Sequence, residues 1–389
     1  MEKIKTDLAI VAAGPAGLCA SVAAAEAGVN VVVFEKSSIA GGTANMGMGP
    51  FGVESNIQRR SMGTLRKEEA FKRFMDYVHW QSDAQLVHDY IWNSGPTINW
   101  LEDMGVRFAG AMKNFPASEA TWHVVMPDDG SRPGARSASA MNRVLFERAQ
   151  ELGVKFYFNT PVKKLLGEKG KKVTGLIAKN DEDGTEYEVS AKAVIIATGG
   201  FGTNPEMVKE YCDYTLEYDM FDFMVPGIVG DGIKMAWELG AGKGRMEMER
   251  LGGSMLPGVK QGNYPEARLF GNAGAIAVNK LGYRCCDESV LQNGSISGNI
   301  VDFQKDRTLY RIMSSNVVRH YRRNGVDFPT EVFHFDPAAT FEEEYPKIAE
   351  EHPTMAWVAD SPEELAKKIG LPVDIFLATV ERYNEQCAQ

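Results

Sequence analysis

Long apolar runs, metal-binding cysteine motifs and an excess of basic residues are all missing from this sequence of 389 residues. No stretch approaches the roughly 18 apolar residues that a membrane-spanning helix needs, so no membrane span is expected. The formal net charge of −10 argues against nucleic acid and anionic membranes as partners. Residues Met1 to Lys5 run directly into the first predicted strand. This leaves no room for a signal peptide, so a cytoplasmic location is expected.

The five cysteines do not form a recognisable metal or haem motif. They contain no C-x-x-C spacing, which argues against an iron–sulfur cluster or an attached c-type haem, and no metal site is expected. Their odd number fits a reducing compartment. Two interpretations remain for the adjacent pair Cys285–Cys286. The pair is either a redox-active dithiol or, as we favour, two small side chains beside a buried strand.

The stretch from residue 7 to residue 35 predicts a βαβ unit with a tight turn. Strand Asp7–Ala12 is followed by a turn, a helix of small residues and a second strand that ends before Glu35. Gly14 and Gly17 occupy the second and third glycine positions of G-x-G-x-x-G, where small residues let the backbone approach a pyrophosphate. Ala12 stands at the first position, where a positive φ would be strained. Glu35 lies where a carboxylate accepts hydrogen bonds from a ribose hydroxyl.

Two further segments indicate which dinucleotide is bound. Ile39–Gly49 is a glycine-rich, nearly uncharged loop whose backbone can lie against a flat ring system. Ala193–Gly200 is an apolar strand that runs into Thr-Gly-Gly, at the sheet edge where α/β proteins bind ligands. A nicotinamide cofactor would need neither segment, so an NAD-linked dehydrogenase is disfavoured.

The middle of the chain predicts helices followed by an irregular stretch. Apolar spacing favours helices over Glu68–Trp80, Asp83–Ser94 and Thr97–Met104, with a break at Gly95–Pro96. The apolar residues of Phe108–Arg136 show no clear periodicity, so this stretch is predicted to be an irregular segment near the bound ligand. Its residues with useful chemistry are Trp122, His123 and Arg132, with loop packing as the alternative interpretation. After residue 251, a strand at Gly274–Val278 and charged helices such as Asp302–Arg323 are expected.

Taken in order, these segments resemble the FAD-dependent fumarate reductase/succinate dehydrogenase flavoprotein family. The resemblance spans essentially the whole chain. It implies an α/β fold with a Rossmann-like FAD-binding domain over residues 1–250, built on a parallel sheet with a β-meander, with a helical and loop excursion at about 56–136. An α+β capping domain over residues 251–389 is expected to close over the flavin and the substrate. The matching pieces are Val11–Leu18, Glu35–Ser37, Gly41–Thr43, Ala197–Gly200, Gly230–Gly232, Val278–Arg284 and Thr379–Asn384.

The resemblance implies FAD as the cofactor and assigns its contacts residue by residue. Asp231 is either a helix N-cap or an FAD contact, and both roles can hold at once. The residues expected to bind FAD are Ala13, Gly14, Pro15, Ala16, Gly17, Glu35, Lys36, Ser37, Gly41, Gly42, Thr43, Ala44, Asn45, Met46, Gly47, Val162, Ala197, Thr198, Gly199 and Asp231.

The implied reaction is hydride transfer between flavin N5 and a carbon–carbon double bond. The positions of the fumarate reductases' substrate histidine and proton-donating arginine are taken here by Gly252 and Gln292. A glutamine amide cannot serve as that acid, so a small unsaturated organic substrate other than fumarate is expected. The catalytic candidates are Arg284, Arg268 and Arg250. With no second nucleotide-binding unit or haem motif, electrons are expected from a separate protein or from free reduced flavin.

The family's chain returns to the flavin domain after the segment that Thr379–Asn384 matches, whereas only residues 385–389 follow it here. The chain is therefore expected to be a fragment, to receive the returning segment from a partner chain, or to have lost catalysis. The alternative function is a flavin-binding or interaction subunit without its own catalysis.

Overall fold

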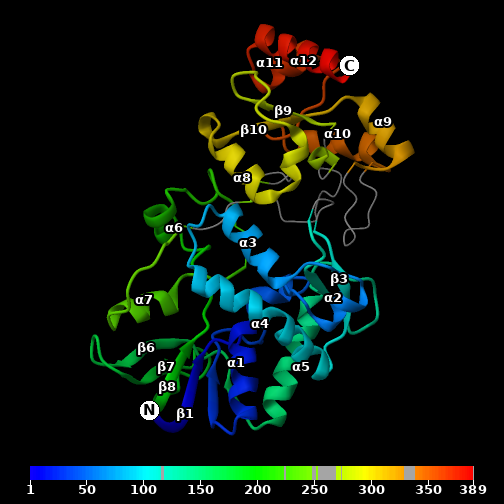
Figure 1. Cartoon of the computed structure of the whole chain (residues 1–389). Helices are drawn as coiled ribbons and strands as arrows, with labels where there is room; N and C mark the ends of the chain where they lie inside the picture. The colour runs from blue at the N-terminus through cyan, green and yellow to red at the C-terminus, as the bar shows by residue number, and fades with distance from the viewer. Residues whose placement is uncertain are drawn as a thin grey trace. The chain divides into compact units, whose positions relative to one another are not determined.

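The computed structural model describes residues 1–114, 118–222, 225–247, 251–252, 269–272, 274–327 and 338–388. The chain divides into two compact units (Figure 1). Unit 1 comprises Met1–Asn204 and Val225–Arg245, and unit 2 comprises Pro205–Met224 and Met246–Gln389. The predicted division into an FAD-binding domain (residues 1–250) and a capping domain (residues 251–389) stays a prediction. Within the described ranges, no helix combines the length and apolar character needed to cross a membrane.

Unit 1 is built on a six-stranded sheet in the order β5-β2-β1-β8-β7-β6. Strands β5, β2, β1 and β8 pair in parallel, whereas β8, β7 and β6 form an antiparallel meander. The predicted α/β fold with a parallel sheet and a meander is confirmed. The strands are β1 (Glu2–Val11), β2 (Val31–Phe34), β5 (Lys155–Tyr157), β6 (Val162–Gly167), β7 (Val173–Lys179) and β8 (Glu186–Ile196).

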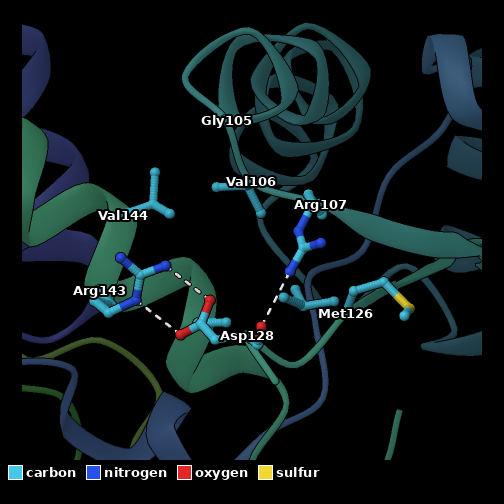
Figure 2. Close-up of a pocket in the computed structure, with 9 residues that line it drawn as sticks. Gly105, Val106, Arg107, Met126, Asp128, Arg143 and Val144 are labelled. Atoms are coloured by element: carbon cyan, nitrogen blue, oxygen red, sulfur yellow. Dashed lines mark hydrogen bonds and ion pairs between the residues drawn. The ribbon is translucent and has the colours of Figure 1, made fainter. Parts of the chain in front are cut away.

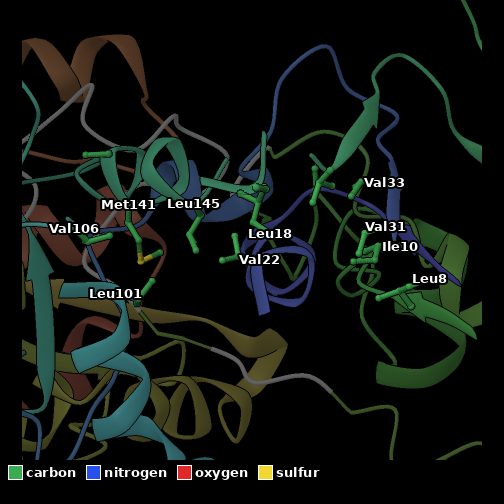
Figure 3. Close-up of a cluster of buried hydrophobic side chains, with 14 of the residues drawn as sticks. Leu8, Ile10, Leu18, Val22, Val31, Val33, Leu101, Val106, Met141 and Leu145 are labelled. Carbon is green, nitrogen blue, oxygen red and sulfur yellow. The ribbon is translucent and has the colours of Figure 1, made fainter. Parts of the chain in front are cut away.

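Helices α1 (Pro15–Glu26) and α5 (Ala138–Glu151) pack with one face of this sheet. Figure 3 shows side chains from β1, α1 and α5 meeting there, including Ile10, Leu18 and Leu145, each fully buried. Burying one such side chain stabilises the fold by about 1.5–3 kcal/mol. A second cluster on the opposite face joins alternate residues of the same strands to the meander.

Strand β8 differs from its prediction because it is one strand of 11 residues. The sequence predicts two separate pieces, at Thr185–Val189 and from Ala193 onward. The first half of β8, as far as Ser190, pairs with β7 on one edge. On its other edge, β8 pairs with β1 along nearly the whole length of β8. Beyond Ser190, no described strand lies on the second edge of β8. Ile195 and Ile196 near its end are 37% and 38% exposed.

The predicted break at Gly95–Pro96 is wrong, because α4 (Ala84–Asp103) continues through Pro96. A proline lacks the N–H that would bond the carbonyl four residues earlier. That carbonyl belongs to Trp92, and Lys67 Nζ donates to it at 2.9 Å. Glycine is required at position 95, since a Cβ there would lie 2.3 Å from the Val53 carbonyl oxygen.

The remaining elements of unit 1 include a hairpin inside the predicted irregular stretch. Strands β3 (Phe108–Met112) and β4 (Trp122–Val125) pair in antiparallel fashion, so Phe108–Arg136 is not irregular throughout. The other helices of this unit are η1 (Gly42–Met46), α2 (Asn56–Arg60), α3 (Lys67–Tyr77) and α7 (Asp231–Glu238).

Unit 2 combines a two-stranded sheet with short helices. Strands β9 (Ile276–Asn279) and β10 (Leu309–Ile312) pair in antiparallel fashion, so the prediction of helix across Asp302–Arg323 is wrong at β10. Phe376 is fully buried against this sheet. The helices are α6 (Pro205–Cys212), η3 (Glu288–Gln292), α8 (Gly294–Asp302), η4 (Lys305–Arg307), α9 (Ser315–Asn324), α10 (Phe341–Glu351), α11 (Pro362–Ile369) and α12 (Val373–Cys387).

Replacing the donor beside Pro96 should destabilise the protein in a way that depends on the proline. Lys67→Met leaves the Trp92 carbonyl without its donor, and we expect a loss of about 1–2 kcal/mol in the free energy of unfolding. In a Pro96→Ala background the helix supplies its own N–H, so the same substitution should cost nearly nothing. Denaturant titration of the four proteins measures both costs, with the exposed Lys72→Met as control. Equal costs in the two backgrounds would contradict this account.

Candidate functional site

In the turn after β1, the backbone at the end of the strand lies very close to the first turn of helix α1. Ala12 has a φ of +80°, so the expected strain is present, at a cost of about 1–2 kcal/mol for an L-residue. Gly17 lies so close that a Cβ there would be 2.0 Å from the Ala12 carbonyl oxygen, and only glycine fits. Gly14 caps α1, and Pro15 opens its first turn. The N–H groups of that turn have no acceptor within the helix and suit an anion.

Glu35 lies at the end of β2 as a buried carboxylate, 6% exposed. Its Oε2 accepts the Ala13 N–H at 2.7 Å, and its Oε1 accepts the Ser37 N–H at 2.8 Å. These bonds fix the carboxylate beside the turn. Each oxygen keeps a further lone pair for a hydroxyl donor.

The glycine-rich loop lies directly against the turn. Gly41 donates its N–H to the Ala13 carbonyl at 2.8 Å, and its φ is +110°. A Cβ on Gly42 would lie 3.3 Å from the Gly14 Cα, so the loop backbone and the turn are in close contact. From there the chain forms the short helix η1, which carries Thr43, Ala44, Asn45 and Met46 and is followed by Gly47.

Asn142 on α5 reaches this loop with an unpaired oxygen. Its Nδ2 donates to Asn45 Oδ1 at 2.7 Å, while Asn45 Nδ2 donates to the Ala40 carbonyl at 2.8 Å. Because a carbonyl only accepts, these two bonds fix the orientation of both amides. Asn142 is 2% exposed, and its Oδ1 has no donor among the described residues. A buried unpaired acceptor costs about 1–3 kcal/mol, which a donor on a ligand would offset.

The sequence reasoning did not single out Asn142. One signal was available, because Asn142 stands three residues before the inward-facing Leu145 on the predicted helix. A polar amide on the apolar side of a helix needs a partner, and that need marks the position as unusual.

The segment after β8 meets the start of α7. The Ala197 N–H donates to the Val11 carbonyl at 2.9 Å, which places Thr198 and Gly199 next to the turn after β1. A Cβ on Gly232 would lie 2.3 Å from Thr198 Oγ1, so α7 packs closely against this segment. Gly230 caps α7, and Asp231 is its first helical residue, so the N-cap interpretation of Asp231 is wrong.

Lys36 and Asp231 form an ion pair that joins the end of β2 to α7. Lys36 Nζ lies 2.9 Å from Asp231 Oδ2 and also donates to the Gly227 carbonyl. Their side chains are partly exposed, so the pair itself contributes only about 0–1 kcal/mol. Val162 lies elsewhere on the same sheet, buried at the start of β6.

His123 is a core residue with no surface for chemistry. It is fully buried, and its Nδ1 lies 3.1 Å from the Thr121 carbonyl. That carbonyl only accepts, so Nδ1 carries the proton and Nε2 accepts the Ser55 hydroxyl at 2.6 Å. Burial lowers the pKa of His123 and keeps it neutral. Trp122 donates to the Gly49 carbonyl and Arg132 is exposed, which favours the packing interpretation of this stretch.

Arg284 is engaged within unit 2. Its Nε lies 3.0 Å and 3.1 Å from the two carboxylate oxygens of Glu288, which is 2% exposed. Glu288 also accepts the Ala277 N–H at 2.9 Å. The hydrogen bonds that Arg284 donates to the Glu288 carboxylate raise the pKa of Arg284. The other two catalytic candidates, Arg250 and Arg268, lie outside the described residues.

Figure 2 shows a cavity in unit 1 that contains none of the predicted site residues. Arg143 Nε and Nη2 each lie 2.7 Å from the Asp128 carboxylate on its wall. Its volume of about 270 Å³ is below the roughly 300–1,000 Å³ of typical small-molecule sites. It is not the candidate site.

Comparison with known proteins identifies the family to which the chain belongs. A family model described as FAD binding domain matches residues 7–389. Vinyl phenol reductase of Lactiplantibacillus plantarum is 27% identical over 98% of this chain and 76% of its own length. NADH:fumarate oxidoreductase of Klebsiella pneumoniae is 29% identical over 97% of this chain, which spans 37% of that protein.

A solved structure shows the same fold. The 3-ketosteroid-Δ4-(5α)-dehydrogenase from Rhodococcus jostii superposes with a TM-score of 0.74 at 24% identity, covering 99% of this chain and 78% of that one. The family match leaves only the first six residues outside it. The chain therefore belongs to the FAD-dependent fumarate reductase/succinate dehydrogenase flavoprotein family of oxidoreductases, and its cofactor is FAD.

Proposed function

We propose that this chain transfers a hydride between FAD and a carbon–carbon double bond of a small organic substrate other than fumarate. The observation that carries the proposal is the similarity to a vinyl phenol reductase along 98% of the chain. FAD supplies the two-electron chemistry when it is bound. Gln292, whose amide donates to the Ser289 carbonyl, supports a substrate other than fumarate. An amide there cannot give a proton, and Gly252 has no side chain to hold a carboxylate.

The cofactor-binding residues are part of this proposal. We assign the pyrophosphate to the turn Ala13–Gly17, the ribose hydroxyls to Glu35 and the ring system to the loop Gly41–Gly47. The remaining assigned contacts are Lys36, Ser37, Val162, Ala197, Thr198, Gly199 and Asp231. The close approach of Gly17 to Ala12 and the unpaired Oδ1 of Asn142 support an occupant that brings its own hydrogen-bond donors.

Among the three catalytic candidates, Arg284 already has a structural partner. Because it is paired with the buried Glu288, its first role is to hold the segment after β9. Arg250 and Arg268 remain candidates for binding a polar or aromatic substrate. A separate electron donor, either a protein or free reduced flavin, completes the proposed cycle.

The open edge of β8 supports a further strand from outside residues 1–389. The half of β8 after Ser190 carries Ala193, Val194, Ile195 and Ile196, and β1 is its single partner among the described strands. An unpaired apolar edge favours strand addition. The strand would run parallel, like β1 and β2, and a partner chain or more of the same polypeptide would supply it. The alternative function, a flavin-binding or interaction subunit without its own catalysis, is also compatible with this edge.

Removing the Glu35 charge should weaken FAD binding. Glu35→Gln loses charged acceptors for hydroxyl donors, and we expect Kd for FAD to rise about 10–100-fold. Flavin fluorescence titration of the apoprotein measures Kd. Thermal unfolding of the same sample separates this loss from misfolding, with Glu186→Gln, at a partly exposed carboxylate remote in sequence from the turn, as matched control. An unchanged Kd in a folded Glu35→Gln protein would remove Glu35 from the site.

Reoxidation of the bound flavin tests the reaction. The FAD-loaded protein is reduced anaerobically and mixed with vinyl phenol or fumarate, and the return of the oxidised flavin spectrum is followed. We expect vinyl phenol to act at least about tenfold faster, which is a barrier difference of about 1.4 kcal/mol. Faster reoxidation by fumarate would overturn the substrate proposal. If neither acceptor nor any other alkene reoxidises a stoichiometric flavin, the alternative function holds.

A charge on the open edge should be tolerated in residues 1–389. Ile195→Lys is expected to change the free energy of unfolding by less than about 0.5 kcal/mol. Ile10→Ala, at the paired position of β1, should cost about 2–5 kcal/mol. Denaturant titration compares the two. A cost at Ile195 as large as the cost at Ile10 would mean that the face of β8 that carries Ile195 is already covered.

A further inference from the structure

Two asparagine side chains connect the glycine-rich loop to helix α5. Asn45, on η1, donates from Nδ2 to the Ala40 carbonyl at 2.8 Å. Asn142 donates from its own Nδ2 to Asn45 Oδ1 at 2.7 Å, and the same nitrogen lies 3.4 Å from the Gly41 carbonyl oxygen. The two amides therefore form one chain of hydrogen bonds that runs from α5 into the backbone of the loop.

The loop backbone wraps closely around the Asn45 side chain. The φ of +110° at Gly41 lies in the region that favours glycine, and a Cβ at this position would lie 2.1 Å from Asn45 Oδ1. Gly41 is buried, whereas Gly42 and Thr43 are exposed. The amides thus hold the inner side of the loop and leave its outer side open to solvent.

The contact with the loop leaves the oxygen of Asn142 unsatisfied. Its Nδ2 faces the two acceptors of the loop, while its buried Oδ1 has no donor among the described residues. Turning the amide over would not help, because its oxygen would then face Asn45 Oδ1 and the Gly41 carbonyl, which only accept. A buried unpaired acceptor lowers the stability of a fold. Asn142 therefore holds the loop at a cost to the stability of unit 1.

The position of the loop matters because the loop also contacts the turn after β1. The Gly41 N–H donates to the Ala13 carbonyl at 2.8 Å, and a Cβ on Gly42 would lie only 3.3 Å from the Gly14 Cα. Helix α5 is a firm support for the amide chain, since its Leu145 is fully buried in the core. A loop with so little clearance presents a different surface if this support is lost.

We propose that Asn142 is a positioning residue for FAD and that it acts through Asn45 on the glycine-rich loop. The inference rests on the proposed function, which assigns this loop to the ring system. Because the amide pair holds the loop in one conformation in the free protein, binding has less conformational entropy to remove. The effect of Asn142 is therefore on the affinity for FAD and on the surroundings of the ring system, and not on the stability of the fold.

Replacing Asn142 by leucine separates affinity from stability. Asn142→Leu removes the donor to the loop together with the unpaired oxygen, so the melting temperature of the FAD-free full chain should stay unchanged or rise. Fluorescence titration should nevertheless show a Kd for FAD that is about tenfold higher. The absorption bands of the bound flavin should also shift, since a displaced loop changes the surroundings of the ring system.

Gln58→Met is the matched control. Gln58 is a buried amide of the same unit, also 2% exposed, but both ends of its amide are paired, with the Glu54 N–H and the Ala120 carbonyl. Its replacement should lower the melting temperature by at least about 2 °C and leave the Kd for FAD unchanged. The same behaviour in Asn142→Leu would mean that Asn142 has only a structural role.

Hydrogen exchange and a double variant locate the effect in the loop. In the FAD-free full chain, the Gly41 N–H should exchange at least about tenfold faster in Asn142→Leu than in the unaltered protein, and Gln58→Met should not change its rate. Asn45→Ala removes the loop partner of Asn142, so combining it with Asn142→Leu should raise the Kd no further than the stronger single variant does. Increases in Kd that multiply in the double variant would overturn the proposal.

These readouts involve no alkene, so they are independent of the proposed reaction. If no alkene reoxidises the bound flavin, the proposed reaction fails while the effect of Asn142 on the loop and on Kd still stands. If Asn142→Leu leaves both the exchange rate of Gly41 and the Kd unchanged, this inference fails while hydride transfer is unaffected.

Discussion

A single buried carboxylate organises the candidate FAD site. Glu35 accepts one N–H from the turn after β1 and another from the residue pair that follows β2. A buried charge is stable only when such donors surround it, so the two chain segments are held at a fixed separation. Gly41 adds a third segment through its bond to the Ala13 carbonyl. Turn, strand end and glycine-rich loop therefore behave as one rigid piece, and the cofactor assignments depend on that rigidity.

The sequence predicted what depends on local chemistry. Glycine at position 17 and a carboxylate at position 35 are dictated by close approach and by hydrogen bonding, and both can be read from residue type and spacing. The α/β fold, the meander and the family followed from the same signals. Positions of this kind have few physical alternatives, so the prediction and the structure agree.

The differences arise where partners lie far apart in the chain. Pro96 does not break α4 because Lys67, from another helix, bonds the carbonyl that the proline leaves free. Ser55 and His123 are 68 residues apart, and Lys36 and Asp231 are 195 residues apart. Asn142 contacts the glycine-rich loop only after α5 has packed. Such long-range pairings cannot be predicted from periodicity or spacing in the sequence. Charged residues that the sequence suggested as ligand contacts therefore turn out to have partners within the protein.

The continuity of β8 has a consequence for synthesis on the ribosome. Its first half closes the meander with β7, its neighbour in sequence, whereas its register places Glu2 beside Tyr187. At about 5–20 residues per second, roughly 10–40 s separate the synthesis of these two positions. During that time the apolar edge of β1 has β2 on one side and water on the other. Until β8 has been made, β1 therefore keeps one unpaired edge that is open to non-native strand pairing.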